Sequence, residues 1–424
     1  MSVDSWDPTP RPAASYADRL ELELEGSLEE EAGGGRRPGV IAGGVLLAIA
    51  VVLTAMNLRP AITSVGPLLA EMRADLGASA LWASLLTTLP GLCFAGAGLA
   101  APLLSRRFGI GAAISFALAV LTVGLVLRVV DGPLVVLGGT LVATAGIALV
   151  NVLIPVVIRD SFPARVGMMT GVYTAALQGG GALGSSVSPP IEGVLGGWRP
   201  ALGGWAVLAA IALVAWLLAA RGTGRTARTT TGGEGGRSLM RNRLAWIVTI
   251  FFGLQAFIAY VVMGWLPQVF IDAGVSKGDA GLLLGLMSVI AVPISLVIPP
   301  IAARQGSQSL WILGMGVCGF AGMLGLLFAP GASPLLWSIL IGIGMSVFSL
   351  ALTVIALRAR TGADTARLSG MAQGFGYLLA AVGPFVFGLL HDATGGWTVS
   401  LIVLIVVMCA QMAFGVLAGR RRFV

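Results

Sequence analysis

Charged side chains are rare in this sequence, because Asp, Glu, Lys and Arg together make up only 11% of its 424 residues. A soluble globular protein carries about 25% of these residues. Hydrophobic residues reach 57%, so the composition excludes an ordinary soluble protein and indicates that a lipid bilayer surrounds most of the chain. Lysine is almost absent, with Lys277 the only one among 26 Lys and Arg residues. We interpret this bias as typical of a GC-rich bacterial genome.

Cysteine and histidine are also scarce, with three cysteines and one histidine. Cys93, Cys318 and Cys409 fall inside separate apolar runs, a pattern that fits neither a disulfide framework nor a metal site. A single histidine cannot form a histidine cluster, and no nucleophile–base pair stands out. The sequence therefore predicts a protein that is not an enzyme and has no metal or cofactor.

Twelve apolar segments recur along the chain, and each is long enough to cross ~30 Å of hydrocarbon at ~1.5 Å per residue. They lie at 40–70, 80–104, 110–128, 133–158, 167–190, 198–220, 244–270, 278–302, 309–328, 333–357, 368–390 and 397–419. The 61 glycines fit membrane helices that approach one another closely. The sequence predicts an all-α integral membrane protein with twelve transmembrane helices.

Two polar regions divide the chain into domains. Residues 1–37 hold nine acidic and four basic side chains, which predicts a disordered acidic tail. No apolar segment precedes residue 40, so we expect no cleaved signal peptide. Residues 221–243 are rich in Gly, Thr and Arg and predict a flexible cytoplasmic linker. We therefore expect two six-helix bundles, at 38–220 and 244–424.

Basic residues are distributed unevenly between the two sides of the predicted membrane. With an even number of spans, one side receives Arg106, Arg107, Arg159, Arg165, Arg221 to Arg243, Arg304, Arg358, Arg360, Arg367 and Arg420 to Arg422. The other side receives Arg128, Arg199 and Lys277 in loops, with Arg73 at a helix end. Because cytoplasmic loops carry the excess of Lys and Arg, both termini are predicted to be cytoplasmic. We read these basic loops as topology signals and expect no nucleic-acid partner.

The two predicted bundles are related by an internal repeat. A shift of 199 residues places Arg159 on Arg358, Gly171 on Gly370, and Gly196-Gly197-Trp198 on Gly395-Gly396-Trp397, and a shift of 200 places Pro67 on Pro267. Both bundles begin on the same side of the membrane, so the repeat is parallel. Parallel six-helix halves are the construction of the major facilitator superfamily.

Several sequence segments strengthen this resemblance. They are Asn57 to Leu69 (NLRPAITSVGPLL), Leu86 to Pro90 (LTTLP), Thr170 to Ala176 (TGVYTAA), Ser369 to Tyr377 (SGMAQGFGY) and His391 to Trp397 (HDATGGW). Residues 38–424 resemble the major facilitator superfamily and, within it, the cyanate and nitroimidazole transporter family (CynX/NimT). The resemblance implies a twelve-helix alternating-access carrier for a small anion or a small heterocycle.

The loop after the second predicted span departs from the superfamily pattern. The superfamily motif is roughly G-x-L-a-D-R-x-G, and the matching stretch here is Pro102 to Gly109 (PLLSRRFG). Arg106 stands where the motif has its aspartate, so the usual contacts of that carboxylate cannot form. We expect a gating role for Arg106, Arg107 and Gly109, with an acidic partner that the sequence does not identify.

Arg59 is the strongest candidate for substrate binding. It follows the apolar run 40–56 and precedes Pro60, and a cation inside a membrane helix is costly enough that it usually marks a substrate or ion path. Prolines break the helix there, which is tolerated where the backbone lines a cavity. The five donors of the guanidinium suit an anion with two acceptor ends. The alternative is a structural arginine bound to a carbonyl or to an acid on another helix.

Other polar residues inside the predicted spans are candidates for the same cavity. They are Asn57, Asn151, Tyr173, Gln178, Gln255, Tyr260, Gln373 and Tyr377. Hydrogen bonding between helices is the alternative for the amides. Trp265 lies near a predicted membrane interface, where we expect it to belong to an aromatic belt.

Acidic residues are poorly placed for proton coupling, because most of them fall in predicted loops or at helix ends. Glu71, at the end of the first span, is the remaining candidate for a coupling acid. We expect a capping or loop role for His391, beside Asp392. Transport is then facilitated diffusion or exchange, or a proton accompanies the substrate.

The predicted function is a secondary transporter in the bacterial cytoplasmic membrane that moves a cyanate-like anion or a nitroimidazole-like heterocycle, anchored at Arg59. An efflux carrier for neutral aromatic toxicants or drugs is the main alternative, and a membrane sensor that transports nothing is the third. The expected partners are a small-molecule substrate and the lipid bilayer, and we expect a monomer.

Overall fold

Long apolar runs form every regular element in this computed structural model, which describes residues 40–162, 165–220, 239–360 and 362–424. All regular elements in these ranges are helices. The helices of the first part are α2 (Val40–Asn57), α3 (Pro60–Thr63), α4 (Val65–Asp75), α5 (Ala80–Phe108), α6 (Ile110–Leu127), α7 (Pro133–Ser161), α8 (Val166–Leu195) and α9 (Trp198–Ala220). Those of the second part are η2 (Leu239–Arg241), α10 (Arg243–Asp272), α11 (Lys277–Ala303), α12 (Ser309–Phe328), α13 (Pro334–Met345), α14 (Val347–Arg358), α15 (Gly362–Thr394) and α16 (Thr398–Ala418).

Eleven helical stretches among the described residues are long and apolar enough to cross a membrane. They correspond to eleven of the twelve predicted spans. The remaining predicted span is α8, which is 30 residues long but rich in glycine and serine. Small residues allow close contact with neighbouring helices at the expense of hydropathy. The all-α membrane fold is therefore confirmed, and the spanning role of α8 stays a prediction.

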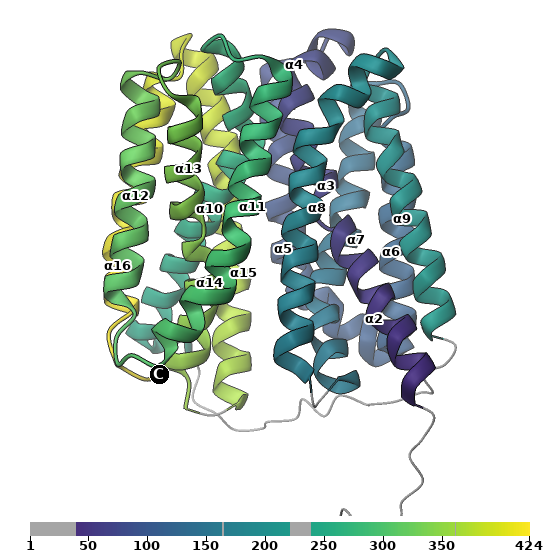
Figure 1. The fold of residues 1–424 in the computed structure, drawn as a ribbon, viewed down its shortest axis with the longest axis vertical. Helices are drawn as coiled ribbons and strands as arrows, with labels where there is room; N and C mark the ends of the chain where they lie inside the picture. Colours follow the sequence, from purple (N-terminus) through teal and green to yellow (C-terminus); the bar gives the residue numbers. More distant parts are fainter. Residues whose placement is uncertain (1–39, 163–164, 221–238, 361) are drawn as a thin grey trace, which may run out of the picture. The chain divides into compact units, whose positions relative to one another are not determined.

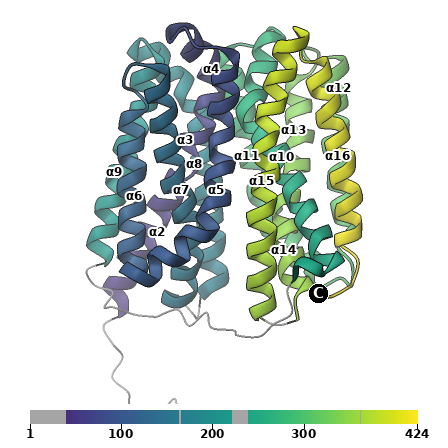
Figure 2. The same ribbon diagram turned by 180° about the vertical axis from the view of Figure 1, so that it is seen from behind.

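Only part of the predicted domain boundaries falls on described residues. The tail 1–37 and residues 221–238 of the linker lie outside them. The described end of the linker forms η2, and Asn242 then caps α10, because its side-chain oxygen accepts from the backbone N–H of Leu244 at 2.8 Å. Residues 44–424 make one compact unit, in which residues 44–220 and 239–424 occupy two sides (Figures 1 and 2).

The internal repeat is visible as one local structure that occurs twice. Trp198 donates its indole N–H to Asp75 at 3.0 Å, and Trp397 donates its own to Asp272 at 2.8 Å. A glycine two residues before each tryptophan has a positive φ, 75° in the first part and 67° in the second, which favours glycine at a helix end. In each half, the tryptophan at the start of the last predicted span therefore binds the acid at the end of the first. Trp198 links α9 to α4, and Trp397 links α16 to α10.

Glycines at the interface allow helices of the two halves to pack closely. A Cβ added to Gly91 of α5 would lie 2.9 Å from the Cα atom of Ala381 on α15, and one added to Gly285 of α11 would overlap with Ser186 on α8. We call the end of the unit that carries α4 the α4 end, and the end where the chain finishes the C-terminal end (Figure 1).

Candidate functional site

The first predicted span is broken at the position that its prolines indicate. Leu58 and Arg59 separate α2 from α3, and Pro60 occupies the first position of α3. Proline is tolerated there because that N–H has no partner inside the helix. The carbonyl oxygen of Arg59 accepts from the N–H groups of Ile62 and Thr63, each at 2.9 Å. The break therefore holds Arg59 between two helices and not within one.

The Arg59 side chain passes along the line where α8 meets α11. A Cβ built on Gly181 of α8 would lie 3.2 Å from Cδ of Arg59 and 3.6 Å from the hydroxyl oxygen of Ser288 on α11. Glycine at this position leaves room for the arginine stem. Arg59 is half-buried, and no salt bridge between described residues includes it. A half-buried cation without a carboxylate partner in this part of the chain is suited to receive an anion.

Three tyrosines lie within electrostatic range of the Arg59 guanidinium. Tyr173 of α8, Tyr260 of α10 and Tyr377 of α15 all interact electrostatically with its charge. The whole chain contains only four tyrosines, so three of them meet at one place. Because α8 belongs to the first half and α10 and α15 to the second, this grouping joins both halves around Arg59.

An aromatic cluster extends from two of these tyrosines. The ring of Phe94 on α5 lies 6.2 Å from that of Tyr260 and 5.2 Å from that of Tyr377, measured between centroids. The ring of Phe252 lies 5.2 Å from Tyr377. Sequence reasoning missed both phenylalanines, because a phenylalanine in an apolar helix carries no signal that separates a cavity wall from a lipid-facing residue. Tilted pairs of this kind provide a wall for a planar ligand.

Asn151 joins the same region through one of the tyrosines. The hydroxyl of Tyr173 donates to the side-chain oxygen of Asn151 at 2.8 Å, which links α8 to α7. Asn151 is half-buried. The structure therefore brings Asn151, Tyr173, Tyr260 and Tyr377 together with Arg59, all of them predicted from the sequence.

Two of the predicted amides are engaged in helix packing. Asn57 donates to the carbonyl oxygens of Leu53 at 2.7 Å and Leu208 at 3.2 Å. Gln255 donates to the carbonyl oxygen of Met345 at 3.1 Å and accepts from the side chain of Gln411 at 3.0 Å. These contacts match the interhelical alternative, and a role in substrate binding stays a prediction for both residues.

The remaining two amides differ in their surroundings. Gln373 donates to the hydroxyl of Ser369, one turn earlier on the same helix, at 2.7 Å. Gln178 is buried, and its side-chain oxygen has no hydrogen-bond partner within the described ranges. A buried polar atom without a partner is rare, so Gln178 remains a candidate for contact with a ligand.

Arg128 is a second buried arginine, although the sequence places it in a loop. It is only 1% exposed, and its guanidinium donates to the carbonyl oxygen of Ala61 at 2.6 Å and to the hydroxyl of Ser64 at 3.5 Å. Ala61 lies in α3 and Ser64 between α3 and α4, so Arg128 supports the broken helix. Arg128 follows the end of α6, outside the helix as expected, but its side chain is buried against this break.

An ion-pair cluster joins the two halves at the α4 end. The ammonium of Lys277, at the start of α11, lies 2.8 Å from the carboxylate of Glu71 on α4 and 2.5 Å from that of Glu192 on α8. The only lysine of the chain is thus shared by two acids of the other half. Glu71 is paired in this arrangement, and its predicted role as a coupling acid is untested.

Comparison with known proteins decides the family. Residues 45–384 match the model of the Major Facilitator Superfamily. The chain belongs to this superfamily. It is 36% identical to the 2-nitroimidazole transporter of Escherichia coli (strain K12), over 89% of this chain and 96% of that protein. It is 31% identical to the cyanate transport protein CynX of the same organism, over 82% of this chain and 91% of that protein.

A solved structure supports the same fold. A bacterial homologue of the human lysosomal transporter Spinster has a TM-score of 0.71 to this chain at 15% identity, covering 91% of this chain and 98% of its own. Together with the family match, this confirms the major facilitator fold and the resemblance predicted from the sequence. The protein is a secondary transporter of the major facilitator superfamily with multiple membrane-spanning helices.

The predicted gating loop of this major facilitator is described in part. The side chain of Arg106 lies outside the described residues. Arg107 is exposed, with its guanidinium carbon 5.4 Å from the centre of the adjacent Phe108 ring. Gly109 has a φ of 83° and alone connects α5 to α6, a conformation that requires glycine. A gating role for the three residues stays a prediction.

Trp265 is not a lipid-facing belt residue, so that expectation was wrong. Its side chain is 2% exposed, and its indole N–H donates to the carbonyl oxygen of Pro384 at 2.9 Å. Position near a helix end indicated the membrane interface, but α15 covers this tryptophan. The buried Trp265 side chain instead lines a cavity at the α4 end.

Proposed function

We propose that this major facilitator moves a small anion or a small polar heterocycle across the bacterial cytoplasmic membrane, with Arg59 as the substrate anchor. The observation that carries the proposal is a half-buried guanidinium that has no carboxylate partner among the described residues and lies within electrostatic range of three tyrosines from both halves. A guanidinium keeps its charge and presents a planar fork of donors to carboxylate, nitro or pseudohalide groups. The two Escherichia coli relatives, a 2-nitroimidazole transporter and a cyanate transport protein, are named for substrates of this class.

The arrangement of the halves supports alternating access. Residues 38–220 and 244–424 would rock about the Arg59 region, with 221–243 as the connecting linker, as in related folds. In this structure Lys277 bridges to acids of the first half at the α4 end, and Gly91 meets Ala381 further along α5. We infer from these contacts that the α4 end is the closed one. The excess of arginine at the C-terminal end supports a cytoplasmic position for both termini, with the α4 end outside.

The aromatic cluster favours a second candidate function, efflux of neutral aromatic compounds. Phe94, Tyr260 and Tyr377 offer ring faces at centroid distances of 5.2 to 6.2 Å. Such rings bind planar ligands with or without charge. A nitroimidazole would use both features, its ring against the cluster and its nitro group at Arg59.

A thermal-shift screen separates the two candidates. The full-length protein is compared with Arg59→Ala and with Arg304→Ala, which removes an exposed arginine outside the site. The ligands are cyanate, nitrate, short carboxylates, 2-nitroimidazole and uncharged aromatic compounds. A ligand at 100 times its Kd stabilises the native state by about 2.7 kcal/mol.

The anion proposal predicts that an anion raises the melting temperature of the wild type and of Arg304→Ala but not of Arg59→Ala. Stabilisation by neutral aromatic compounds alone, equal in all three proteins, would reject Arg59 as the anchor and favour the efflux carrier. The melting temperatures without ligand show whether Arg59→Ala remains folded.

A further inference from the structure

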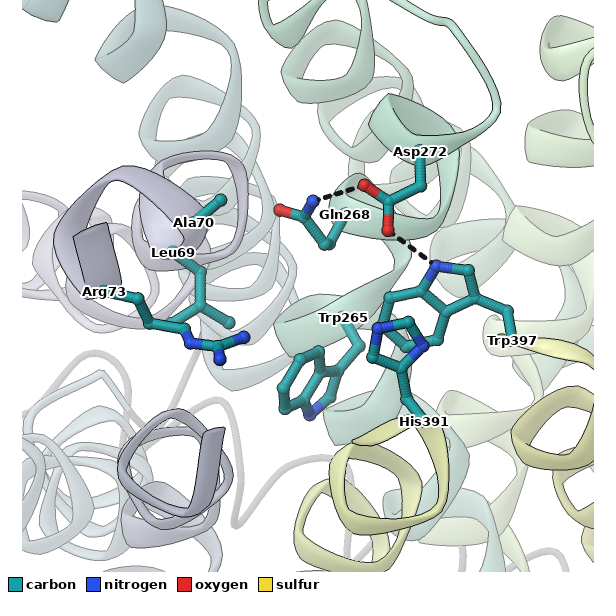
Figure 3. Close-up of a pocket in the computed structure, with 8 residues that line it drawn as sticks. All are labelled: Leu69, Ala70, Arg73, Trp265, Gln268, Asp272, His391 and Trp397. Atoms are coloured by element: carbon teal, nitrogen blue, oxygen red, sulfur yellow. Dashed lines mark hydrogen bonds between the residues drawn. The ribbon is translucent and has the colours of Figure 1, made fainter. Parts of the chain in front are cut away.

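A cavity of about 220 Å³ lies at the α4 end, apart from the Arg59 region. Arg73 of α4 forms one side, and Trp265, Gln268 and Asp272 of α10 form the next (Figure 3). His391 of α15 and Trp397, just before α16, complete it. Arg73 follows Arg59 by 14 residues, which is about 20 Å along helical backbone. The cavity is therefore separate from the proposed substrate site.

Three buried polar atoms at this cavity have no hydrogen-bond partner within the described ranges. They are Nε of Arg73, the side-chain oxygen of Gln268 and Nδ1 of His391. Buried polar atoms almost always have a partner. In Figure 3 the Arg73 guanidinium and the Gln268 oxygen face one another across the cavity. Their convergence from two separate helices indicates a binding site and not a packing gap.

The walls of the cavity are fixed by contacts of their own. Asp272 accepts from the amide nitrogen of Gln268 at 2.7 Å and from the indole of Trp397 at 2.8 Å. Because the amide nitrogen is held by Asp272, the amide oxygen is directed to the cavity. The His391 ring stacks on Trp397 at 3.6 Å between centroids, with 13° between the ring planes. These groups are held in place before any ligand binds, which lowers the entropic cost of binding.

We propose that this cavity binds a small planar carboxylic acid that also carries an N–H donor, and that the bound ligand holds the α4 end closed. The carboxylate would pair with Arg73, the only cation lining the cavity among the described residues. The donor would serve the Gln268 oxygen, and the ring would lie against Trp265 and His391. A guanidinium–carboxylate pair and an amide acceptor together select such a molecule over a simple anion.

The effect on closure rests on the proposed rocking of the two halves. Arg73 belongs to the first half, whereas Trp265, Gln268 and His391 belong to the second. Any motion that separates α4 from α10 and α15 would divide the site. A ligand that binds only the assembled cavity shifts the equilibrium toward the closed α4 end. The cavity would then act as a regulatory site, open to solutes on the outer side.

Calorimetric titration of the full-length protein with imidazole-4-carboxylate tests the binding site. Because imidazole-4-carboxylate also falls in the substrate class proposed for Arg59, the titrations use the Arg59→Gln background, in which the proposed substrate site does not contribute. We expect Arg59→Gln with and without the exposed control Arg304→Gln to bind alike, and addition of Arg73→Gln or Gln268→Leu to weaken binding at least about tenfold. Benzoate lacks the N–H donor, so Gln268→Leu should leave its binding unchanged while Arg73→Gln weakens it. The site is rejected if the Arg59→Gln protein shows no saturable binding, or if addition of Arg73→Gln leaves its affinity unchanged.

A distance measurement tests the effect on closure. Spin labels are placed at Ala74→Cys on α4 and Ala393→Cys on α15, both exposed, after replacement of Cys93, Cys318 and Cys409. Imidazole-4-carboxylate should enrich the short-distance population, and Arg73→Gln should remove this response. An unchanged distribution, or a shift to longer distances, would overturn the regulatory role. Anion flux in proteoliposomes is measured separately, so a failure of the proposed transport function is distinguishable from a failure of this site.

Discussion

Replacement of Lys277 by methionine is expected to open the α4 end. The ammonium of Lys277 lies within 2.8 Å of Glu71 and within 2.5 Å of Glu192, and both acids belong to the opposite half. Without the cation, two carboxylates remain close together in the closed arrangement. Both acids belong to the first half, so their mutual repulsion stays the same when the halves move apart. The variant therefore loses two attractions that only the closed arrangement makes.

The expected size of the effect follows from the exposure of the three groups. The side chains of Lys277 and Glu71 are each 35% exposed, and that of Glu192 is 12% exposed. Exposed ion pairs contribute about 0.2–1 kcal/mol each, and partial burial places these two toward the upper end. A loss of about 1–2 kcal/mol moves the ratio of closed to open molecules roughly 5- to 30-fold.

Spin labels at Ala74→Cys and Ala393→Cys measure this ratio directly in Lys277→Met. The matched control is Arg199→Gln, which breaks pairs with Asp75 and Asp131 at the same end but within the first half. Salt at 1 M shortens the Debye length to about 3 Å, so the wild type should move part of the way toward the Lys277→Met distribution. Identical distributions for wild type and Lys277→Met would refute the view that this cluster holds the halves together.

Three further outcomes are expected. Gly181→Val should displace the Arg59 side chain, since an added Cβ already lies 3.2 Å from its Cδ, and should lower transport at least about tenfold. The control is Gly179→Val, which has open space around the added side chain. Flux reports the loss of transport, and the melting temperature reports any loss of stability. Gly124→Ala would overlap with the backbone of α7 and should destabilise the protein by about 1–3 kcal/mol, while Gly138→Ala meets no atom within 4 Å; equal melting temperatures would contradict this. Hydrogen bonds from the Trp198 indole and the Arg199 guanidinium lower the pKa of Asp75 below its usual range. The Asp75 carboxylate therefore stabilises the fold above the unfolded-state pKa of about 4, and this contribution is lost as the pH falls through the folded-state pKa. Asp75→Asn should flatten the decline of melting temperature on acidification, and an unchanged slope would contradict this prediction.

The sequence was sufficient for the fold, and it named several of the residues that the structure brings close to Arg59. Hydropathy located the helices, since apolar runs of this length are typical of membrane-spanning helices. Arg59 and Pro60 predicted a broken helix with a cation, and the break is present. Tyr173, Tyr260 and Tyr377 were predicted separately. The structure adds that all three lie within electrostatic range of the Arg59 guanidinium.

The remaining features depend on contacts between distant segments, which local patterns do not encode. Trp265 lies near a predicted helix end, and this position indicated the membrane interface, but neighbouring helices bury it. Arg128 follows a helix as expected, and its burial against the break in the first span depends on contacts with a distant segment. The repeat predicts that Arg159 and Arg358 are equivalent. Arg159 is nevertheless exposed beside Asp160, whereas Arg358 is 2% exposed and donates to backbone carbonyls at the C-terminal end. Sequence correspondence located these residues but did not determine their environments.

The central claim is that Arg59 anchors a transported anion, and exchange of that anion in proteoliposomes tests it most directly. The labelled anion is the one that stabilises the wild type, and the proteins compared are wild type, Arg59→Gln and Arg304→Gln, each with its melting temperature recorded. Loss of a charged hydrogen bond of about 1.5–3 kcal/mol predicts that Arg59→Gln, still folded, exchanges the anion at least about tenfold more slowly than the other two. Exchange by Arg59→Gln at the wild-type rate would contradict the account.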